Sequence, residues 1–322
     1  MKIYHGFEEI TVPPKGAVVT IGNFDGVHIG HQQVIGLAVE RARKAGGTSV
    51  VVTFSPHTRA FFSREKALPM ITSLNQRIEL IGRIGVDILV VQPFNSEFAE
   101  ITHEDFVVKL LLNKLAVERL IVSSKFRFGK GAGGNVEMLR KMAGEHGFKV
   151  EEIDDVRYRY TFVSSSFIRQ AIAKGEMELV MGLLGRPYRI SGSVYPDTHR
   201  GTELLSFPTS NVSPDNELIP VKGIYASAVQ VDKTRYPAAT YIGTRPTFEG
   251  DKLVIETHLI DFQGSLYGQT ISVDFFKKMR EDIKFDSVEA LKAQITKDVK
   301  QIREYFSRHA DDQLIQPINW PE

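Results

Sequence analysis

Cysteine is absent from the 322-residue sequence. This absence excludes disulfide bonds, thiolate metal sites and a cysteine nucleophile, and it fits a reducing compartment. Long apolar runs are absent too, since none approaches the roughly 20 residues that a membrane-spanning helix needs. The opening residues, MKIYHGFEEITVPPKG, carry charges where a secretory signal has its apolar core. We therefore expect a cytoplasmic protein that has no contact with membranes.

An excess of charge of one sign is also lacking. The chain has 40 Lys and Arg against 39 Asp and Glu, so its formal net charge is +1. Proteins that bind nucleic acid usually carry a basic excess, so we expect no nucleic acid as a partner. The sequence leaves a local basic surface and self-association into a homo-oligomer open. A hydrophobic content of 42% is typical of a globular protein, and the length suits two ordinary domains or one large one.

The first half of the sequence alternates between short apolar runs and amphipathic segments. The apolar runs are rich in Val and Ile, as is typical of buried strands, and the amphipathic segments have helical spacing. Strands that alternate with helices predict a parallel sheet covered on both faces, with ligands beyond the carboxyl ends of the strands. The predicted strands are residues 17–22, 48–56, 86–94, 117–124 and 148–154, and the predicted helices are residues 31–47, 73–85, 102–115 and 135–147.

The second half has a different pattern. Two helical segments, 164–175 and 176–185, precede short strand-like runs that Gly, Pro and Asp separate over residues 188–276. Turn signals at this spacing predict an antiparallel barrel or sandwich. Residues 287–309 predict a helix that closes this domain.

The change of pattern predicts the domain organisation. The fold class is α/β, with a doubly wound, Rossmann-like N-terminal domain over residues 1–185 and an antiparallel β-barrel domain with its closing helix over residues 186–308. A tail over residues 309–322 has no periodicity and carries the single tryptophan, Trp320.

The turn after the first predicted strand carries two histidines. His28 and His31 lie three residues apart, just where a helical pattern begins. A metal site would need a third ligand, for which His57 or Asp25 is available, and no H-E-x-x-H string occurs. Core packing would place the imidazoles on the apolar stripe of the helix, where neither lies. Phosphate binding fits better, because the free N–H groups and the dipole of a helix N-terminus favour an anion, although no Walker A string occurs.

The string GNFDGVHIGHQ, residues 22–32, resembles the HxGH signature of nucleotidylyltransferases. In its longer form it resembles the adenylyltransferase module of the bacterial bifunctional riboflavin kinase/FAD synthetases. Further strings match this family in the same order: TFSPH (53–57), FRFGKG (126–131), VSSSFIR (163–169) and LLGRPY (183–188). The resemblance implies a nucleotidylyltransferase domain followed by a riboflavin kinase domain. It also implies phosphorylation of riboflavin by ATP to FMN, then adenylylation of FMN by ATP to FAD and pyrophosphate.

In the N-terminal domain, the resemblance assigns ATP phosphate binding and stabilisation of the α-phosphoryl transition state to His28 and His31. Arg169 is assigned to the same phosphates. The other residues assigned to binding are Gly22, Asn23, Phe24, Asp25, Gly30, His57, Ser164, Ser165 and Ser166. From the residues alone, Asn23 and Asp25 equally fit an Asx turn, and the three serines fit a helix cap.

In the C-terminal domain, the string LSFPTSNV resembles the P-T-x-N motif of riboflavin kinases. Thr209 and Asn211 offer hard oxygen ligands, which suit Mg²⁺ and nucleotide phosphate, although a proline-led turn would also explain the string. Alternation in the strand-like run places Glu256 on the face of Val254, where a solvated position is the common case. The resemblance instead assigns Glu256 as the general base for the ribityl 5′-hydroxyl, and Arg280 as a contact of the flavin or nucleotide.

The sequence departs from the family pattern in both domains. Lys125 stands where Asp or Asn is usual before FxFG, and Thr58 stands where Pro is common. Gly133–Asn135 also stands where Gly–Asp is common. In the second domain Thr202 replaces an Arg and Ser206 replaces a Gly, and Lys222 or Arg200 could supply the missing charge. Two alternatives therefore stay open: a chain that keeps one activity only, and a flavin-binding protein without turnover.

Overall fold

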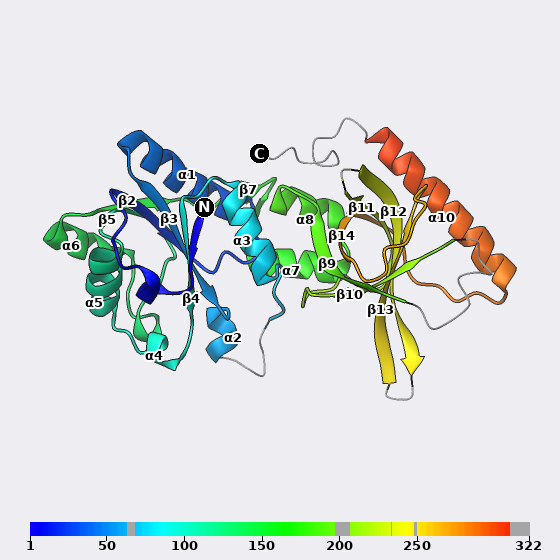
Figure 1. Cartoon of the computed structure of the whole chain (residues 1–322), viewed down its shortest axis with the longest axis horizontal. Helices are drawn as coiled ribbons and strands as arrows, with labels where there is room; N and C mark the ends of the chain where they lie inside the picture. Colours follow the sequence, from blue (N-terminus) through cyan, green and yellow to red (C-terminus); the bar gives the residue numbers. More distant parts are fainter. Residues whose placement is uncertain (63–67, 197–206, 233, 248–249, 310–322) are drawn as a thin grey trace. The chain divides into compact units, whose positions relative to one another are not determined.

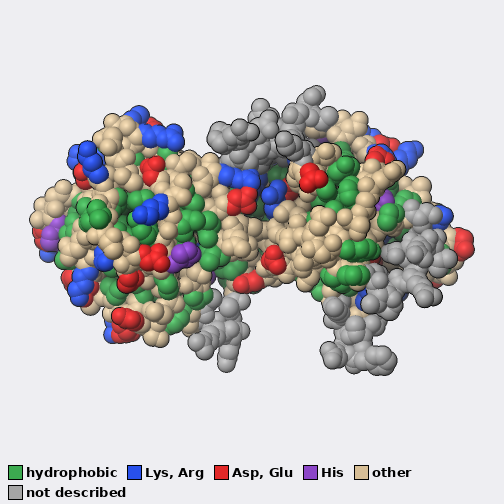
Figure 2. Space-filling view, viewed as in Figure 1, with side chains coloured by type: hydrophobic (Ala, Val, Ile, Leu, Met, Phe, Trp, Pro, Cys, Tyr) green, Lys and Arg blue, Asp and Glu red, His purple; other side chains and the backbone are tan. Residues whose placement is uncertain are grey.

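The computed structural model describes residues 1–62, 68–196, 207–232, 234–247 and 250–309. The chain forms two compact units (Figure 1). The first comprises Met1–Pro69 and Leu74–Ser164, and the second comprises Met70–Ser73 and the chain from Ser165 onward. Basic and acidic side chains of the described residues are interspersed on the face in view, as a net charge of +1 leads one to expect (Figure 2).

The first unit is built on a parallel sheet of six strands in the order β1-β4-β3-β2-β5-β6. The strands are β1 (Lys2–Tyr4), β2 (Ala17–Ile21), β3 (Thr48–Ser55), β4 (Ile88–Pro93), β5 (Val117–Ser123) and β6 (Lys149–Ile153). The predicted doubly wound fold is confirmed, with the predicted strands in place. The edge strand β1 was not predicted; it is three residues long and pairs with β4.

Helices cover both faces of this sheet. One face packs against α1 (Ile29–Ala45) and α3 (Leu74–Arg83), and the other against residues 106–114 and α6 (Val136–His146). Because alternate strand residues point to opposite faces, Val18 lies in one apolar cluster and Val19 in the other. Short elements complete the unit: η1 (Phe7–Glu9), α2 (Thr58–Phe62), α4 (Ser96–Ala99), α5 (His103–Asp105), η4 (Lys130–Ala132), β7 (Arg157–Tyr158) and β8 (Thr161–Phe162).

The α-helix predicted over residues 102–115 was wrong in its geometry. Thr102 caps the segment, because its Oγ1 accepts a hydrogen bond from the Asp105 N–H at 3.1 Å. After α5, however, the chain continues as a π-helix, η3 (Phe106–Lys114), and the Leu115 N–H donates to the Leu110 carbonyl five residues back. The wider turn buries four apolar side chains of η3 against the sheet, and this packing outweighs the intrinsic preference for the α-helix.

The second unit begins with α7 (Ser165–Lys174) and α8 (Met177–Leu184) and continues into a closed antiparallel barrel. Its strands are β9 (Tyr188–Tyr195), β10 (Ser210–Pro214), β11 (Gly223–Val231), β12 (Thr234–Thr247), β13 (Gly250–Leu259) and β14 (Thr270–Arg280). The predicted barrel and its closing helix, α10 (Val288–Arg308), are confirmed. The strand β10 was not predicted, since its PTSN string read as a turn.

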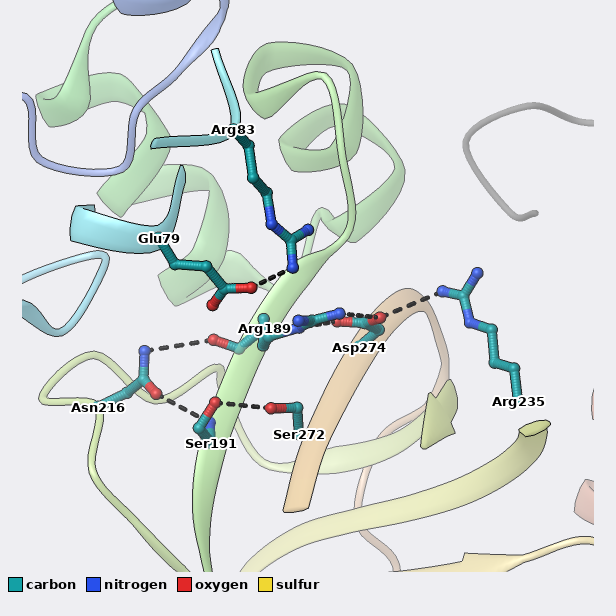
Figure 3. A network of polar contacts seen from close by, with 8 residues as sticks. All are labelled: Glu79, Arg83, Arg189, Ser191, Asn216, Arg235, Ser272 and Asp274. Atoms are coloured by element: carbon teal, nitrogen blue, oxygen red, sulfur yellow. Dashed lines mark hydrogen bonds and ion pairs between the residues drawn. The ribbon is translucent and has the colours of Figure 1, made fainter. Parts of the chain in front are cut away.

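Polar contacts join the barrel strands on the outer surface. Asp274 on β14 lies between the guanidinium groups of Arg189 on β9 and Arg235 on β12 (Figure 3). The Ser191 N–H donates to Oδ1 of Asn216 at 3.0 Å and fixes the chain after β10 against β9. Within the described ranges, no helix combines the length and apolar character that crossing a bilayer requires.

Candidate active sites

The turn between β2 and α1 has an unusual backbone. Phe24 and Val27 have φ angles of 48° and 37°, and Gly26 has 81°. A positive φ is rare for a bulky or β-branched residue and costs on the order of 1–3 kcal/mol. The Phe24 and Val27 side chains are 3% and 1% exposed, so burial holds the turn in this shape. Strain of this kind is characteristic of a ligand-binding loop.

His28 occupies the N-cap of α1. Its Nδ1 accepts a hydrogen bond from the His31 N–H at 3.2 Å, which places the proton of the neutral imidazole on Nε2. The His28 and His31 rings are stacked with centroids 3.5 Å apart. A Cβ on Gly30 would lie 3.3 Å from the His28 ring, so glycine gives that ring its room. Two imidazoles therefore meet at the positive end of a 17-residue helix, which is an anion site by its chemistry.

A buried arginine supports this turn from α3. Arg77 is 3% exposed and donates through Nη1 to the Asn23 carbonyl at 2.6 Å. Burial lowers the pKa of the Arg77 guanidinium, and the carboxylate of Asp25, which is 1% exposed, opposes that shift. Arg77 was missed from the sequence, where it read as a polar residue of an amphipathic helix. The structure thus gives Asp25 a structural role beside its predicted binding role.

We expect Arg77→Met to lower the free energy of unfolding by about 2 kcal/mol, because it removes a charged hydrogen-bond donor to the Asn23 carbonyl and an opposite charge that favours the buried Asp25 carboxylate. The FMN adenylylation that the family resemblance implies should fall with it, because the Asn23 carbonyl loses its charged donor and keeps only the Thr53 hydroxyl of the two. Calorimetric unfolding and FAD formation measure the two effects. The double variant Asp25→Asn/Arg77→Met removes both charges and should regain part of the stability. A double variant no more stable than Arg77→Met would contradict the charge argument.

Asn23 joins the turn to the segment after β3. Its Nδ2 donates to Thr58 Oγ1 at 3.0 Å, and the Thr53 hydroxyl donates to the Asn23 carbonyl at 3.1 Å. Thr58, a departure from the family pattern, thus contributes a contact that proline could not make. His57 directly precedes α2 and is half-buried beyond the carboxyl end of β3.

A group of phenylalanines follows β3 and β4 at the same edge of the sheet. The rings of Phe61 and Phe62 lie 5.3 Å and 5.7 Å from the Phe94 ring, and Phe54 lies 5.8 Å from it. The contacts are edge-to-face, and Phe62 is 64% exposed, so an aromatic ring at the end of this group is open to a ligand. The sequence analysis missed this group because its members come from separate segments.

Lys125 follows β5 and forms an ion pair with Asp155. Its ammonium also lies 5.8 Å from the ring centroid of Phe162 on β8. Val156, the neighbour of Asp155, would lie 3.6 Å from a Cβ on Gly30, so this segment passes close to the start of α1. The unusual lysine therefore anchors the β7–β8 hairpin beside the histidine turn.

The serine segment spans the division between the two units. Ser164 is the last residue of the first unit, and Ser165 starts α7 in the second. Ser164 and Ser166 are exposed, and Arg169 is half-buried. Their contribution to the phosphate site of the first unit stays a prediction.

In the second unit, the predicted kinase residues lie on neighbouring strands. Asn211 on β10 pairs with Glu256 on β13, and directly paired residues present their side chains on the same face. Asn211 is 1% exposed, and neither its Nδ2 nor the buried Oγ1 of Thr209 has a hydrogen-bond partner. Buried polar atoms without a partner are costly, so two of them on residues only two positions apart mark a place for a polar ligand.

Glu256 has a charged partner. Its Oε1 accepts from Nη2 of Arg245 on β12 at 2.6 Å, and the Glu256 side chain is 14% exposed. Tyr241, paired with Glu256 across the strands, donates its hydroxyl to Asp282 at 3.1 Å. Burial and the Asp282 carboxylate raise the pKa of Tyr241 to about 12. A Cβ on Gly243 would lie 1.9 Å from the Tyr241 hydroxyl, so a larger residue at this position would have to displace the Tyr241 ring.

Arg280, predicted to contact flavin or nucleotide, is engaged within the unit. Its Nε and Nη2 donate to the Asp298 carboxylate at 3.0 Å and 2.8 Å, and Asp298 is buried on α10. This ion pair ties α10 to the end of β14, and a ligand role for Arg280 stays a prediction. Lys222 donates to Thr244 Oγ1 at 2.9 Å, next to Arg245.

Some predicted residues cannot be placed. Arg200, Thr202, Ser206 and Trp320 lie outside the described residues. Among the residues that the structure does describe, no group of three or more His, Asp or Glu side chains could hold a metal ion. Within the described residues, His28 and His31 therefore have no third side chain with which to bind a metal ion.

Comparison with known proteins bears on both units. A family model described as FAD synthetase matches residues 11–167, and one described as riboflavin kinase matches residues 184–306. The bifunctional riboflavin kinase/FMN adenylyltransferase of Escherichia coli (strain K12) is 36% identical over 308 residues, 95% of this chain and 98% of that protein. Its counterpart in Pseudomonas fluorescens is 37% identical over 304 residues, 94% and 97% of the two chains.

A solved structure described as a macrolide-efflux protein from Streptococcus pneumoniae has a TM-score of 0.84 and 27% identity, and the match covers 94% of this chain and 98% of that one. The two-unit architecture is therefore shared along almost the whole length of both chains. On the identity and coverage of the bacterial relatives, the chain belongs to the family of bifunctional riboflavin kinase/FMN adenylyltransferases.

Proposed function

We propose that the chain makes FAD from riboflavin in two steps, each at its own site. The second unit phosphorylates riboflavin with ATP to give FMN and ADP, and the first unit adenylylates FMN with a second ATP to give FAD and pyrophosphate. The observation that carries the proposal is the pairing of Glu256 with Asn211, because it puts a carboxylate beside buried polar atoms that lack partners. The stacked histidines at the start of α1 support the adenylyl step.

In the adenylyl step, an oxygen of the FMN phosphate attacks the α-phosphorus of ATP, and the bond to the bridging oxygen of pyrophosphate breaks. The acceptor is already an anion, so no side chain has to act as a base or nucleophile. The Nε2–H of His28, the His31 imidazole and the positive end of the α1 dipole stabilise the oxygens on which charge develops. The exposed ring of Phe62 offers a stacking surface for the planar flavin.

In the kinase step, the ribityl 5′-oxygen attacks the γ-phosphorus of ATP, and the bond to the bridging oxygen of ADP breaks. Glu256 takes the hydroxyl proton. The Thr209 hydroxyl and the Asn211 amide fit Mg²⁺, because both carry hard oxygens and both have an atom without a partner. Rotation of the Asn211 amide by half a turn puts its oxygen at the position without a partner. When bound, Mg²⁺ would neutralise phosphate charge.

The test is to incubate the full chain with riboflavin, ATP and Mg²⁺ and to separate the flavins over time. We expect FMN to rise first and FAD to follow, with two ATP consumed for each FAD. Supplying FMN in place of riboflavin should give FAD without a lag. If FMN is the final product, the adenylyl half of the proposal is wrong. If FAD forms when FMN is supplied but not when riboflavin is supplied, the kinase half is wrong. If neither flavin is converted, the chain is a binding protein.

A further inference from the structure

We propose that Arg245 exchanges partners during the kinase reaction, holding Glu256 in the free enzyme and binding the γ-phosphate of ATP in the complex. The proposal rests on the function above, and it concerns a residue to which neither the sequence analysis nor the family resemblance assigned a role. It makes nucleotide binding the event that releases the base.

The observed ion pair conflicts with the action of Glu256 as a base. Arg245 Nη2 lies 2.6 Å from Glu256 Oε1, and the carboxylate side chain is 14% exposed. A guanidinium at this distance stabilises the charged carboxylate, so it opposes the transfer of a proton to Glu256. The ion pair therefore belongs to the free enzyme. Glu256 can accept a proton once the Arg245 guanidinium is bound to another anion.

The phosphate that would replace Glu256 as the partner of Arg245 has a place close to the ion pair. Arg245 and Glu256 lie on one face of β12 and β13, and Asn211 on β10 is paired directly with Glu256. The partnerless atoms of Thr209 and Asn211 thus lie one strand beyond the ion pair. A phosphate bound at these atoms lies on the side of Glu256 to which Arg245 already points.

Arg245 is the more exposed member of the ion pair. Its side chain is 36% exposed, against 14% for Glu256, so the guanidinium is the more accessible of the two groups to an anion that arrives from solvent. Gly243 lies between Tyr241 and Arg245 on the same face of β12. The Tyr241 hydroxyl is hydrogen-bonded to Asp282. The planar guanidinium can form paired hydrogen bonds to phosphate as well as to carboxylate. The exchange therefore replaces the hydrogen bonds of Arg245 rather than losing them.

Binding of a nucleotide analogue tests the exchange. In the full chain with His28→Ala and His31→Ala, which weaken the nucleotide site of the first unit, calorimetry measures the affinity for β,γ-imido-ATP with Mg²⁺. Arg245→Met should weaken binding about tenfold or more, the value of a lost charge-assisted hydrogen bond. Glu256→Gln should tighten it, because a neutral amide competes for Arg245 more weakly than the carboxylate does. In the double variant Arg245→Met/Glu256→Gln, the gain from Glu256→Gln should disappear.

Two further measurements secure the interpretation. Arg245→Lys should recover part of the affinity, since it keeps the charge without the fork, and it provides a folded variant if Arg245→Met is unstable. Arg303 forms a bidentate exposed ion pair with Asp261 in the same unit, so Arg303→Met should bind the analogue as the parent does. Riboflavin affinity should also be unchanged in Arg303→Met.

Two outcomes would overturn the exchange: analogue affinity in Arg245→Met equal to that of the parent, or a gain from Glu256→Gln that persists without Arg245. In either case Arg245 only holds the carboxylate in place. Failure of the proposed function is a separate result, because it would appear as absence of FMN formation from riboflavin by the parent chain.

Discussion

Replacing Glu256 with Gln should reduce riboflavin phosphorylation about 10³-fold and leave FMN adenylylation unchanged. General base catalysis contributes about 10²–10⁴-fold, and glutamine cannot take the ribityl proton. Glutamine has nearly the same volume and can still accept from Arg245, so the barrel should keep its packing. The measurement is the initial rate of FMN formation from riboflavin, and of FAD formation from FMN, in one preparation. The second activity reports on the integrity of the chain.

A matched control separates this effect from the loss of a carboxylate in general. Glu304 on α10 forms an exposed ion pair with Arg308, so Glu304→Gln removes a charge from the same unit without touching the barrel surface that carries Glu256. Both activities should persist in that variant, because exposed ion pairs contribute little. A Glu256→Gln enzyme with more than a tenth of the parent kinase rate would rule out Glu256 as the base.

Local patterns predicted most of the fold. Val- and Ile-rich runs between amphipathic segments dictate a doubly wound sheet, because each run must be buried on both faces. The π-helix η3 and the strand β10 were not predictable, because both depend on partners far along the chain. β10 exists through its pairing with β9 and β13, and its own residues read as a turn. Tertiary pairing thus overrode local preference at the place where the kinase site is built.

The site was predictable only where its residues are adjacent in sequence. The histidine turn is contiguous, so its anion-binding chemistry could be argued from the string alone. Arg77 reaches Asn23 across 54 positions, and the phenylalanines around Phe94 come from three segments, so no local pattern marks them. The Arg245–Glu256 pair is set by strand register, which the sequence does not specify at single-residue precision.

Replacing His31 with Ala should reduce FMN adenylylation about 10²–10³-fold and leave riboflavin phosphorylation intact, the reverse of the Glu256 variant. Loss of one preorganised donor to a developing charge typically has an effect of this size. The His31 backbone N–H remains in the variant and still bonds to His28 Nδ1, so the N-cap of α1 is kept and stability should change little. Flavin separation after incubation with FMN and ATP measures the loss.

The N-cap position of His28 distinguishes it from His31. His28→Ala removes both a donor and the N-cap of α1, so it should cost about 1 kcal/mol of stability in addition to the adenylyl activity. His28→Asn keeps an N-cap acceptor and should recover the stability without the rate. Exposed His146 at the end of α6 is the matched control, since His146→Ala removes an imidazole of the same unit away from the turn. Equal losses of FAD formation in His31→Ala and His146→Ala would contradict the assignment of the histidine pair to phosphate. The effect would then not depend on the position of the imidazole at the start of α1.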